Sequence, residues 1–197
     1  MLELLAFALA LIIAIDIHEF AHAFTADRLG DPTPRSQGRL SLNPLAHLDP
    51  IGTLMLLVFH FGWGKPVQFD PYNLSNPRRD AAVISLAGPV TNLLLAIITS
   101  ILIKFIPIPN GFMIIPVAII TLNISLAIFN LVPIHPLDGA KILEGILPRD
   151  LAYEYGEVMR QYGTFILIFM ILPVFGTSPI QSLILPIINF LSRLLLG

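Results

Sequence analysis

The sequence predicts an all-α polytopic membrane protein with about five transmembrane helices, a membrane-entering hairpin and a small surface β-sheet. Hydrophobic residues make up 55% of the 197 residues and charged residues only 12%. The mean hydropathy is +0.82, which is far above that of soluble domains. The apolar residues also gather in runs that approach the roughly 20 residues a helix needs to cross a bilayer.

The apolar runs give the expected spans in order. Four runs reach or approach spanning length, and they cover residues 2–24, 81–106, 112–131 and 180–196. A fifth run, 161–175, is short, but residues 151–160 can extend the same helix toward the surface. We see no internal repeat of 20 to 50 residues, so we expect residues 1–197 to form a single membrane-embedded domain.

Two segments between the first and second spans differ from the rest. Residues 25–50 are rich in turn formers, and RLSLN at 39–43 alternates as a strand does, which predicts a small sheet at the surface. Residues 51–61 are too short to span and lead into GWGKP, so we expect 51–67 to dip into the membrane as a hairpin. Such backbone is stable at membrane depth only where protein buries it or where it lines a wet cavity.

The charges predict an orientation and exclude some partners. In the expected topology, all Lys and Arg residues except Lys104 lie on one side of the membrane. By the positive-inside rule this side is expected to be cytoplasmic. A net charge of −2 with scattered cations offers no basic surface for nucleic acid. The chain has no cysteine, which excludes disulfides and thiolate metal sites. The N-terminal run lacks the features of a cleavable signal peptide, so we expect a retained first span.

The first span carries four ionisable residues, Asp16, His18, Glu19 and His22. On a helix the two histidines lie about 40° apart and can reach one ion, while Glu19 borders their face and Asp16 points away toward some polar neighbour. Imidazole and carboxylate ligands suit zinc, which lowers the pKa of a bound water to about 7. Because each charge in a span costs about 2.5–3.5 kcal/mol on insertion scales, a chance cluster is disfavoured. The cluster is expected roughly 9 Å below the cytoplasmic surface.

A third metal ligand has three candidates at membrane level, His60, His135 and Asp138. Asp138 follows two prolines, Pro133 and Pro136, and starts a new helix at an Asp-Gly pair. An aspartate in this place can also serve only as a helix N-cap. The local sequence leaves both roles open.

Three motifs in this order resemble the site-2 protease family of intramembrane zinc metalloproteases: HEFAH at 18–22, SLAGPVTN at 85–92 and NLVPIHPLDG at 130–139. The resemblance covers about residues 5–145, the expected catalytic core, and leaves about 150–197 as accessory helices. It implies one zinc ion per chain. The implied site residues are His18, His22 and Asp138 as metal ligands, Glu19 as catalytic base and Asn130 as a group that helps to hold the oxyanion.

The resemblance also implies weaker substrate contacts. Gly62-Trp63-Gly64 resembles the family's G-x-G element in a membrane-entering loop, so Gly62, Gly64 and Asn92 are the expected substrate-binding residues. Gly88, Pro89 and Asn92 match the family's G-P-x-x-N pattern, in which the small residue permits close helix packing and the asparagine can hydrogen-bond the zinc region. A plain glycine turn at 62–64 and simple helix packing of the second span are equally compatible with these residues. An unwound substrate needs new backbone partners, which a strand edge in RLSLN or in GKPVQF at 64–69 could supply. His135 is a minor candidate, and His47 and His60 are expected to be structural.

The expected function is hydrolysis of peptide bonds within or near transmembrane segments of membrane proteins, either in regulated intramembrane proteolysis or in the clearance of membrane remnants. The expected partners are those substrates and the lipid bilayer of a prokaryotic cell membrane, and the chain resembles compact members without PDZ or CBS domains. Two alternatives come from other classes, a divalent-metal carrier and a zinc-stabilised membrane scaffold. A carrier would space its ligands along a path, and a scaffold would not need Glu19.

Overall fold

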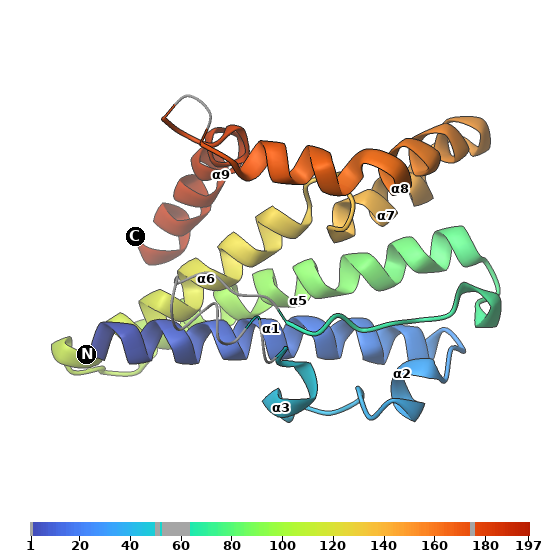
Figure 1. The fold of residues 1–197 in the computed structure, drawn as a ribbon. Coiled ribbons are helices and arrows are strands. Elements are labelled where there is room, and N and C mark those ends of the chain that lie inside the picture. The colour runs from blue at the N-terminus through green and yellow to red at the C-terminus, as the bar shows by residue number, and fades with distance from the viewer. Residues whose placement is uncertain (1, 50–51, 53–63, 174–175) are drawn as a thin grey trace.

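The computed structural model describes residues 2–49, 52, 64–173 and 176–197, and this part of the chain is mostly helical (Figure 1). The long helices are α1 (Leu2–Arg28), α5 (Pro77–Phe105), α6 (Ile114–Asn130), α8 (Arg149–Ile171) and α9 (Pro179–Leu196). The shorter elements are α2 (Thr33–Ser36), α3 (Pro44–His47) and α7 (Asp138–Ile146), with 3₁₀ turns η1 (Pro71–Asn73) and η2 (Asn110–Phe112).

Helix α5 is the centre of the fold. It packs against α1, α6 and α7, and Figure 1 shows it running beside α1. Helix α1 also packs against α6, and its small side chains Ala6, Ala10 and Ala14, which recur every four residues and are all buried, let its neighbours approach closely. The helix that carries HEFAH is thereby held against the helix that carries SLAGPVTN.

A second apolar cluster joins α6, α8 and α9 through buried residues such as Ile124, Leu167 and Ile184. Large apolar side chains also remain exposed on the long helices, including Leu94 at 51% and Phe165 at 71%. Exposed apolar surface of this extent is costly in water but not in a bilayer. The outer surface of the bundle therefore suits lipid.

Helices form where all five spans are expected, but five spans are not confirmed. Among the described residues, three helices are long and apolar enough to cross a membrane, namely α1, α5 and α9. Helix α6 has 17 residues, which give about 25 Å at 1.5 Å per residue and fall short of a core of about 30 Å. The first half of α8 carries charged residues from Arg149 to Arg160, so its apolar part is too short to span alone.

The expected surface sheet is not found in the described ranges, where the only bridge is an isolated antiparallel one between Leu48 and Gly64. RLSLN is irregular, and the helical turns α2 and α3 flank it. Side chains replace the missing strand partners: the His47 Nε2–H donates to the Ser41 carbonyl at 2.8 Å. Prolines in this segment also remove N–H donors that a ladder would need. Of the expected hairpin 51–67, residues 51 and 53–63 lie outside the described part of the chain.

Two buried charges organise the polar connection between α1 and α5. The Arg39 guanidinium donates to the carbonyl oxygens of Ala46, Lys65 and Pro66 and is only 4% exposed. It therefore fastens the segment before α3, and α3 itself, to residues 65 and 66, which run alongside α1.

Asp31 is the second organising charge and is fully buried. Its carboxylate accepts hydrogen bonds from the N–H and hydroxyl of Thr33, the N–H of Asp70 and the side-chain amide of Asn73. Burial alone would raise the pKa of Asp31, but these hydrogen bonds outweigh it and lower the pKa below the usual value of 3.8. Asp31 thus joins the chain just after α1 to the chain just before α5.

Candidate metal centre

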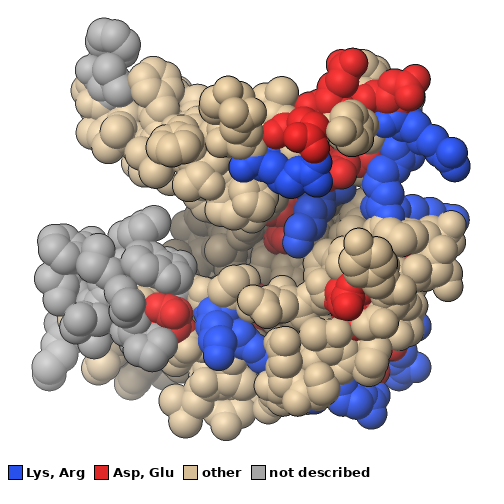
Figure 2. Space-filling model, turned by 45° about the vertical axis from the view of Figure 1, so that its right-hand side comes forward, with Lys and Arg blue, Asp and Glu red and all other residues tan. Residues whose placement is uncertain are grey.

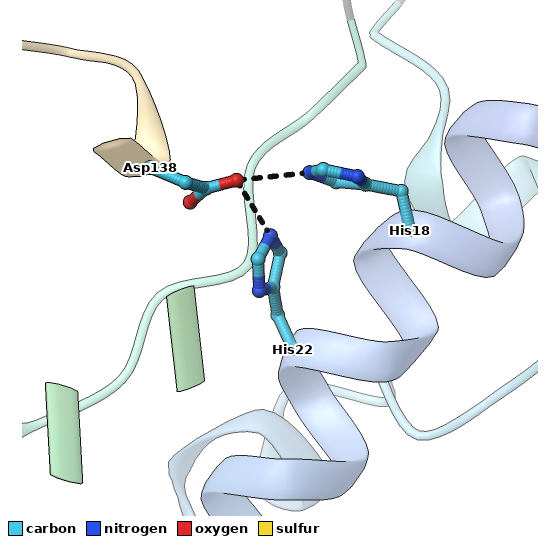
Figure 3. A group of neighbouring side chains, drawn as sticks. All are labelled: His18, His22 and Asp138. Atoms are coloured by element: carbon cyan, nitrogen blue, oxygen red, sulfur yellow. Dashed lines mark hydrogen bonds and ion pairs between the residues drawn. The ribbon is translucent and has the colours of Figure 1, made fainter. Parts of the chain in front are cut away.

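Two histidines and an aspartate from distant parts of the chain meet in the interior (Figure 3). His18 and His22 lie one turn apart on α1, with ring centres 4.6 Å apart and ring planes at 89°. Asp138 begins α7, and its Oδ2 lies 3.1 Å from His18 Nε2 and 3.2 Å from His22 Nε2. The three side chains direct one ligand atom each toward a common point.

The second nitrogen of each ring is already engaged. The His18 Nδ1–H donates to Asn92 Oδ1 at 2.6 Å, and the His22 Nδ1–H donates to the Ile84 carbonyl at 2.7 Å. Because both partners are acceptors, each neutral ring keeps its proton on Nδ1 and presents the lone pair of Nε2 to Asp138. Asn92 is oriented in turn, since its amide donates to the Ala14 carbonyl and to Asn123 Oδ1. Such outer partners are typical of metal-bound histidines.

The donor set fits a divalent metal ion. With both Nδ1 atoms protonated, two nitrogen lone pairs and a carboxylate oxygen face one another, an arrangement that needs a cation between them. Zinc ligands at about 2.0–2.2 Å in tetrahedral geometry lie about 3.4 Å apart, close to the 3.1 and 3.2 Å observed between His18 or His22 and Asp138. Two imidazoles and one carboxylate also match catalytic zinc sites, which keep a fourth position for water or substrate.

Gly88 of α5 makes room for the two histidines. A Cβ at this position would lie 2.6 Å from His18 Cε1 and 2.6 Å from His22 Nε2. Contacts this short do not occur between real Cβ atoms and ring atoms, so a larger residue would displace a ligand. The glycine of the G-P-x-x-N pattern therefore borders the metal centre directly.

The loop between α6 and α7 fixes Asp138. Leu137, not Asp138, occupies the N-cap position of α7, and no side chain caps this helix, so the capping-only role is not what the structure shows. Gly139 lets the new helix pack tightly, because a Cβ there would lie 2.4 Å from the Leu131 carbonyl oxygen. The Asp138 carboxylate is left free to face the histidines.

Helix α8 holds the same loop from the other side. The Tyr155 hydroxyl donates to the Pro133 carbonyl at 2.8 Å, and Gly163 packs against His135, where a Cβ would lie 2.9 Å from the His135 carbonyl oxygen. His135 is not part of the ligand group. Its place in the structure is the contact between the loop and α8.

A cavity of about 420 Å³ opens over the metal centre. Glu19 lines it beside the three ligands, and Glu19 Oε2 accepts a hydrogen bond from the Val67 N–H at 2.7 Å. The extended segment 64–69 forms one wall through Gly64, Val67 and Phe69. Asn130 lines the cavity at the end of α6, where its amide donates to the Leu126 carbonyl at 3.0 Å.

The other described residues singled out in the sequence do not belong to the group of potential metal ligands. Asn92, expected to contact substrate or to hydrogen-bond the zinc region, is fully buried and accepts the hydrogen bond from His18. Asp16 lies near a polar neighbour, with 3.7 Å between its Oδ1 and His47 Nε2, but this oxygen is buried and accepts no hydrogen bond within the described residues. Gly62 and His60 lie outside the described residues.

Two further polar side chains line the cavity, although no role was expected for either: Lys141, and Ser85, the first residue of SLAGPVTN. The Ser85 hydroxyl is buried and has no hydrogen-bond partner among the described residues. Lys141 follows Asp138 by three residues on α7, and this spacing on one helix face is a signal that could have found it. Ser85 gave no such signal, because a lone hydroxyl in an apolar helix most often bonds to its own backbone.

The chain was compared with known proteins. Residues 107–171 match the model of peptidase family M50. The chain is 36% identical over 191 residues to "Putative zinc metalloprotease YwhC" of Bacillus subtilis, which covers 92% of this chain and 84% of that protein. It is 31% identical over 171 residues to "Putative zinc metalloprotease Rip2" of Mycobacterium tuberculosis, which covers 82% of this chain and 65% of that protein.

A more distant relative is the archaeal "Zinc metalloprotease MJ0392" of Methanocaldococcus jannaschii, 25% identical over 144 residues that cover 73% of this chain and 34% of that protein. No solved structure matches the chain. The apolar helices and the relatives together indicate an integral membrane protein. Since the similarity to the Bacillus subtilis protein extends over most of both chains, this protein belongs to peptidase family M50, the site-2 protease family of membrane metalloproteases.

Proposed function

We propose that this protein is an intramembrane zinc metalloprotease that hydrolyses peptide bonds within or near transmembrane segments of other membrane proteins. The observation that supports this best is the convergence of two imidazole nitrogens and a carboxylate beside Glu19, in helices apolar enough to cross a membrane. In this proposal residues 1–197 form one domain, with the catalytic core over about 5–145.

Each residue of the site has a task in hydrolysis. Zinc, held by His18, His22 and Asp138, would act as a Lewis acid toward the peptide carbonyl and make water reactive at neutral pH. Glu19 borders the same cavity, where its carboxylate can take a proton from the attacking water and pass it to the leaving amine. The Asn130 amide lies in the cavity wall and can donate to the oxyanion once it releases the Leu126 carbonyl.

The segment 64–69 is suited to hold an unwound substrate. A transmembrane helix hides its carbonyl groups in hydrogen bonds, so it must unwind before one of them can react. Within the described residues, the carbonyls of Lys65 and Pro66 are taken by Arg39 and the Val67 N–H by Glu19. The backbone groups of Gln68 and Phe69 make no hydrogen bond there, and the segment faces the cavity through Val67 and Phe69. It can therefore receive a substrate strand along its edge.

We also propose that the site opens toward the cytoplasm of a prokaryotic cell. Figure 1 shows that the end of α1 and the starts of α5 and α8 lie at the same end of the molecule, and these termini carry Arg28, Arg78 and Arg149. Figure 2, which brings that end forward, shows its many Lys and Arg side chains. Lys104 lies at the opposite end of α5. Arg193 of α9 lies toward that end too, since the Ser100 hydroxyl donates to the nearby Leu195 carbonyl, so the expectation that Lys104 is alone there is wrong. The positive-inside rule then assigns the Arg-rich end to the cytoplasm.

The carrier and scaffold alternatives are less well supported. A carrier needs ligand groups at several depths, whereas the described residues contain one group of potential metal ligands. A scaffold that uses zinc only to join helices needs neither an open cavity nor a carboxylate such as Glu19 beside the ion.

The test uses purified protein in lipid vesicles with a model transmembrane substrate. Glu19→Gln is expected to keep about one zinc per chain and to lower the cleavage rate about 10²–10⁴-fold, because it removes the base but no ligand. Asp138→Asn is expected to lower the zinc content measured by metal analysis. Glu3→Gln, at an exposed position in the first turn of α1, is the matched control and should change neither quantity.

Two results would contradict the proposal. Undiminished cleavage by Glu19→Gln would remove Glu19 as the base. Failure of the wild-type protein to cleave a panel of membrane substrates, together with zinc transport into the vesicles, would favour a carrier.

A further inference from the structure

A second cavity, of about 360 Å³, lies next to the cavity of the metal centre. Phe69 and Lys141 line both cavities, so the two spaces share a wall. Beyond this wall the second cavity is bordered by Arg78, near the start of α5, and by Glu144 of α7. Its charged lining is thus two cations and one carboxylate.

Both cations are available to a ligand. Lys141 Nζ lies over the Phe69 ring, 4.4 Å from its centre. Within the described residues, the side chains of Lys141 and Arg78 make no hydrogen bond or ion pair. Glu144, Glu19 and Asp138 act on the Lys141 charge only at longer range. With two cations and one carboxylate in its lining, the second cavity carries one excess positive charge.

The geometry relates this charge to the scissile bond. Val67 binds Glu19 through its N–H, and Phe69, two residues further along the same extended segment, touches Lys141. At about 3.3 Å per residue these two positions are roughly 7 Å apart. A substrate strand that lies along 64–69 with its reacting carbonyl near Glu19 would pass Lys141 about two residues later and enter the second cavity.

We propose that Lys141 and Arg78 form an anion-recognising subsite that selects membrane substrates with an acidic side chain about two residues from the scissile bond. This proposal rests on the proposed protease function and adds the substrate preference. A lipid phosphate could also bind two cations, but the wall that this cavity shares with the metal centre favours the substrate. Figure 2 shows Lys and Arg side chains at the edge of the hollow on this face, with acidic side chains nearby.

The test is a set of model transmembrane substrates that carry Asp, Asn or Lys at each of three positions on either side of the cleaved bond. Wild-type protein in vesicles of neutral lipid is expected to cleave the Asp substrate about threefold to fivefold faster than the Asn substrate at one position, as for a partly solvated ion pair. The preference should shrink at high salt. Arg78→Glu should abolish the preference or shift it toward Lys, and Lys141→Gln should weaken it.

Arg79→Glu is the matched control. It changes the charge by the same amount as Arg78→Glu, one residue further along α5, but Arg79 lines neither cavity. It should keep the wild-type preference, and zinc content measured for every variant separates a lost preference from a lost metal. Equal cleavage of Asp, Asn and Lys substrates at every position would overturn the subsite while leaving the protease function intact. Activity that depends on anionic lipid through Arg78, without any positional preference, would instead make the cavity a lipid site.

Discussion

Gly88 controls how closely α5 can approach the two histidines of the metal centre. Most residues of the site act through a side chain, but this one acts through the space that a missing side chain leaves. Ring atoms of His18 and His22 lie within 2.6 Å of the place where a Cβ would be. The close approach of α1 and α5 and the position of both ligand nitrogens therefore require that residue 88 has no Cβ.

Gly88→Ala is expected to lower zinc affinity at least about tenfold, because the added methyl displaces ligand atoms that must stay in place. Competition with a chelator and metal analysis would measure the loss. Gly111→Ala is the matched control, since nothing lies within 4 Å of its Cβ position, and it should bind zinc as the wild type does. Equal zinc affinity in both variants would show that α5 can move away without cost.

The sequence was sufficient to predict which side chains meet at the candidate metal centre but not their surroundings. His18 and His22 are four residues apart on one helix, so local geometry alone places them together. Asp138 had to be added from the motif resemblance, because nothing local indicates which distant residue meets a helix. The sequence could not predict that the two cavities share a wall. Lys141 meets Phe69 only after the chain before α5 has folded back along α1.

At the scale of elements, the connection between α1 and α5 shows how side chains can replace regular structure. RLSLN alternates as a strand does, but Arg39 and His47 take the carbonyl groups that a neighbouring strand would need. Alternation reports which residues can face a core and gives no information on competing side-chain donors. The expected sheet was therefore replaced by two helical turns and a single bridge.

The Asp31 carboxylate gives this connection a dependence on pH. Its pKa is lower in the folded protein than the usual 3.8, so Asp31 stabilises the fold fully above about pH 5 and loses this effect as the pH falls below 3.8 toward the folded-state pKa. Asp31→Ala is expected to lower the free energy of unfolding by about 2–4 kcal/mol at pH 7, because several buried donors lose their acceptor.

Unfolding in detergent, followed at pH 7 and at pH 3, would measure this effect. The difference between the wild type and Asp31→Ala should shrink at the lower pH. Asp150→Asn, at an exposed position at the start of α8, should unfold like the wild type at pH 7. A difference between wild type and Asp31→Ala that is independent of pH would assign the stabilisation to packing and not to charge.

At the scale of the whole molecule, hydropathy predicted the helices better than it predicted how many of them span. All five apolar runs became helices, but α6 is short and the first half of α8 is charged. Composition shows that a segment can enter a bilayer, whereas length and neighbours decide whether it crosses alone.

The orientation of the whole protein can be tested because the chain has no cysteine. We expect Lys104→Cys to react with a membrane-impermeant maleimide on intact cells, and Arg79→Cys to react only after the cells are opened. Both positions are exposed, so access depends on the side of the membrane. The opposite labelling pattern would place the metal centre near the outer face.

The metal ligands come from parts of the sequence that are far apart, with 120 residues between His18 and Asp138. A chain that is still on the ribosome holds both imidazoles long before the aspartate is made. Until α7 emerges and docks, the nascent protein has an incomplete set of ligands and no assembled centre. Under the proposed function, the nascent protein therefore cannot hydrolyse a peptide bond before α7 is made.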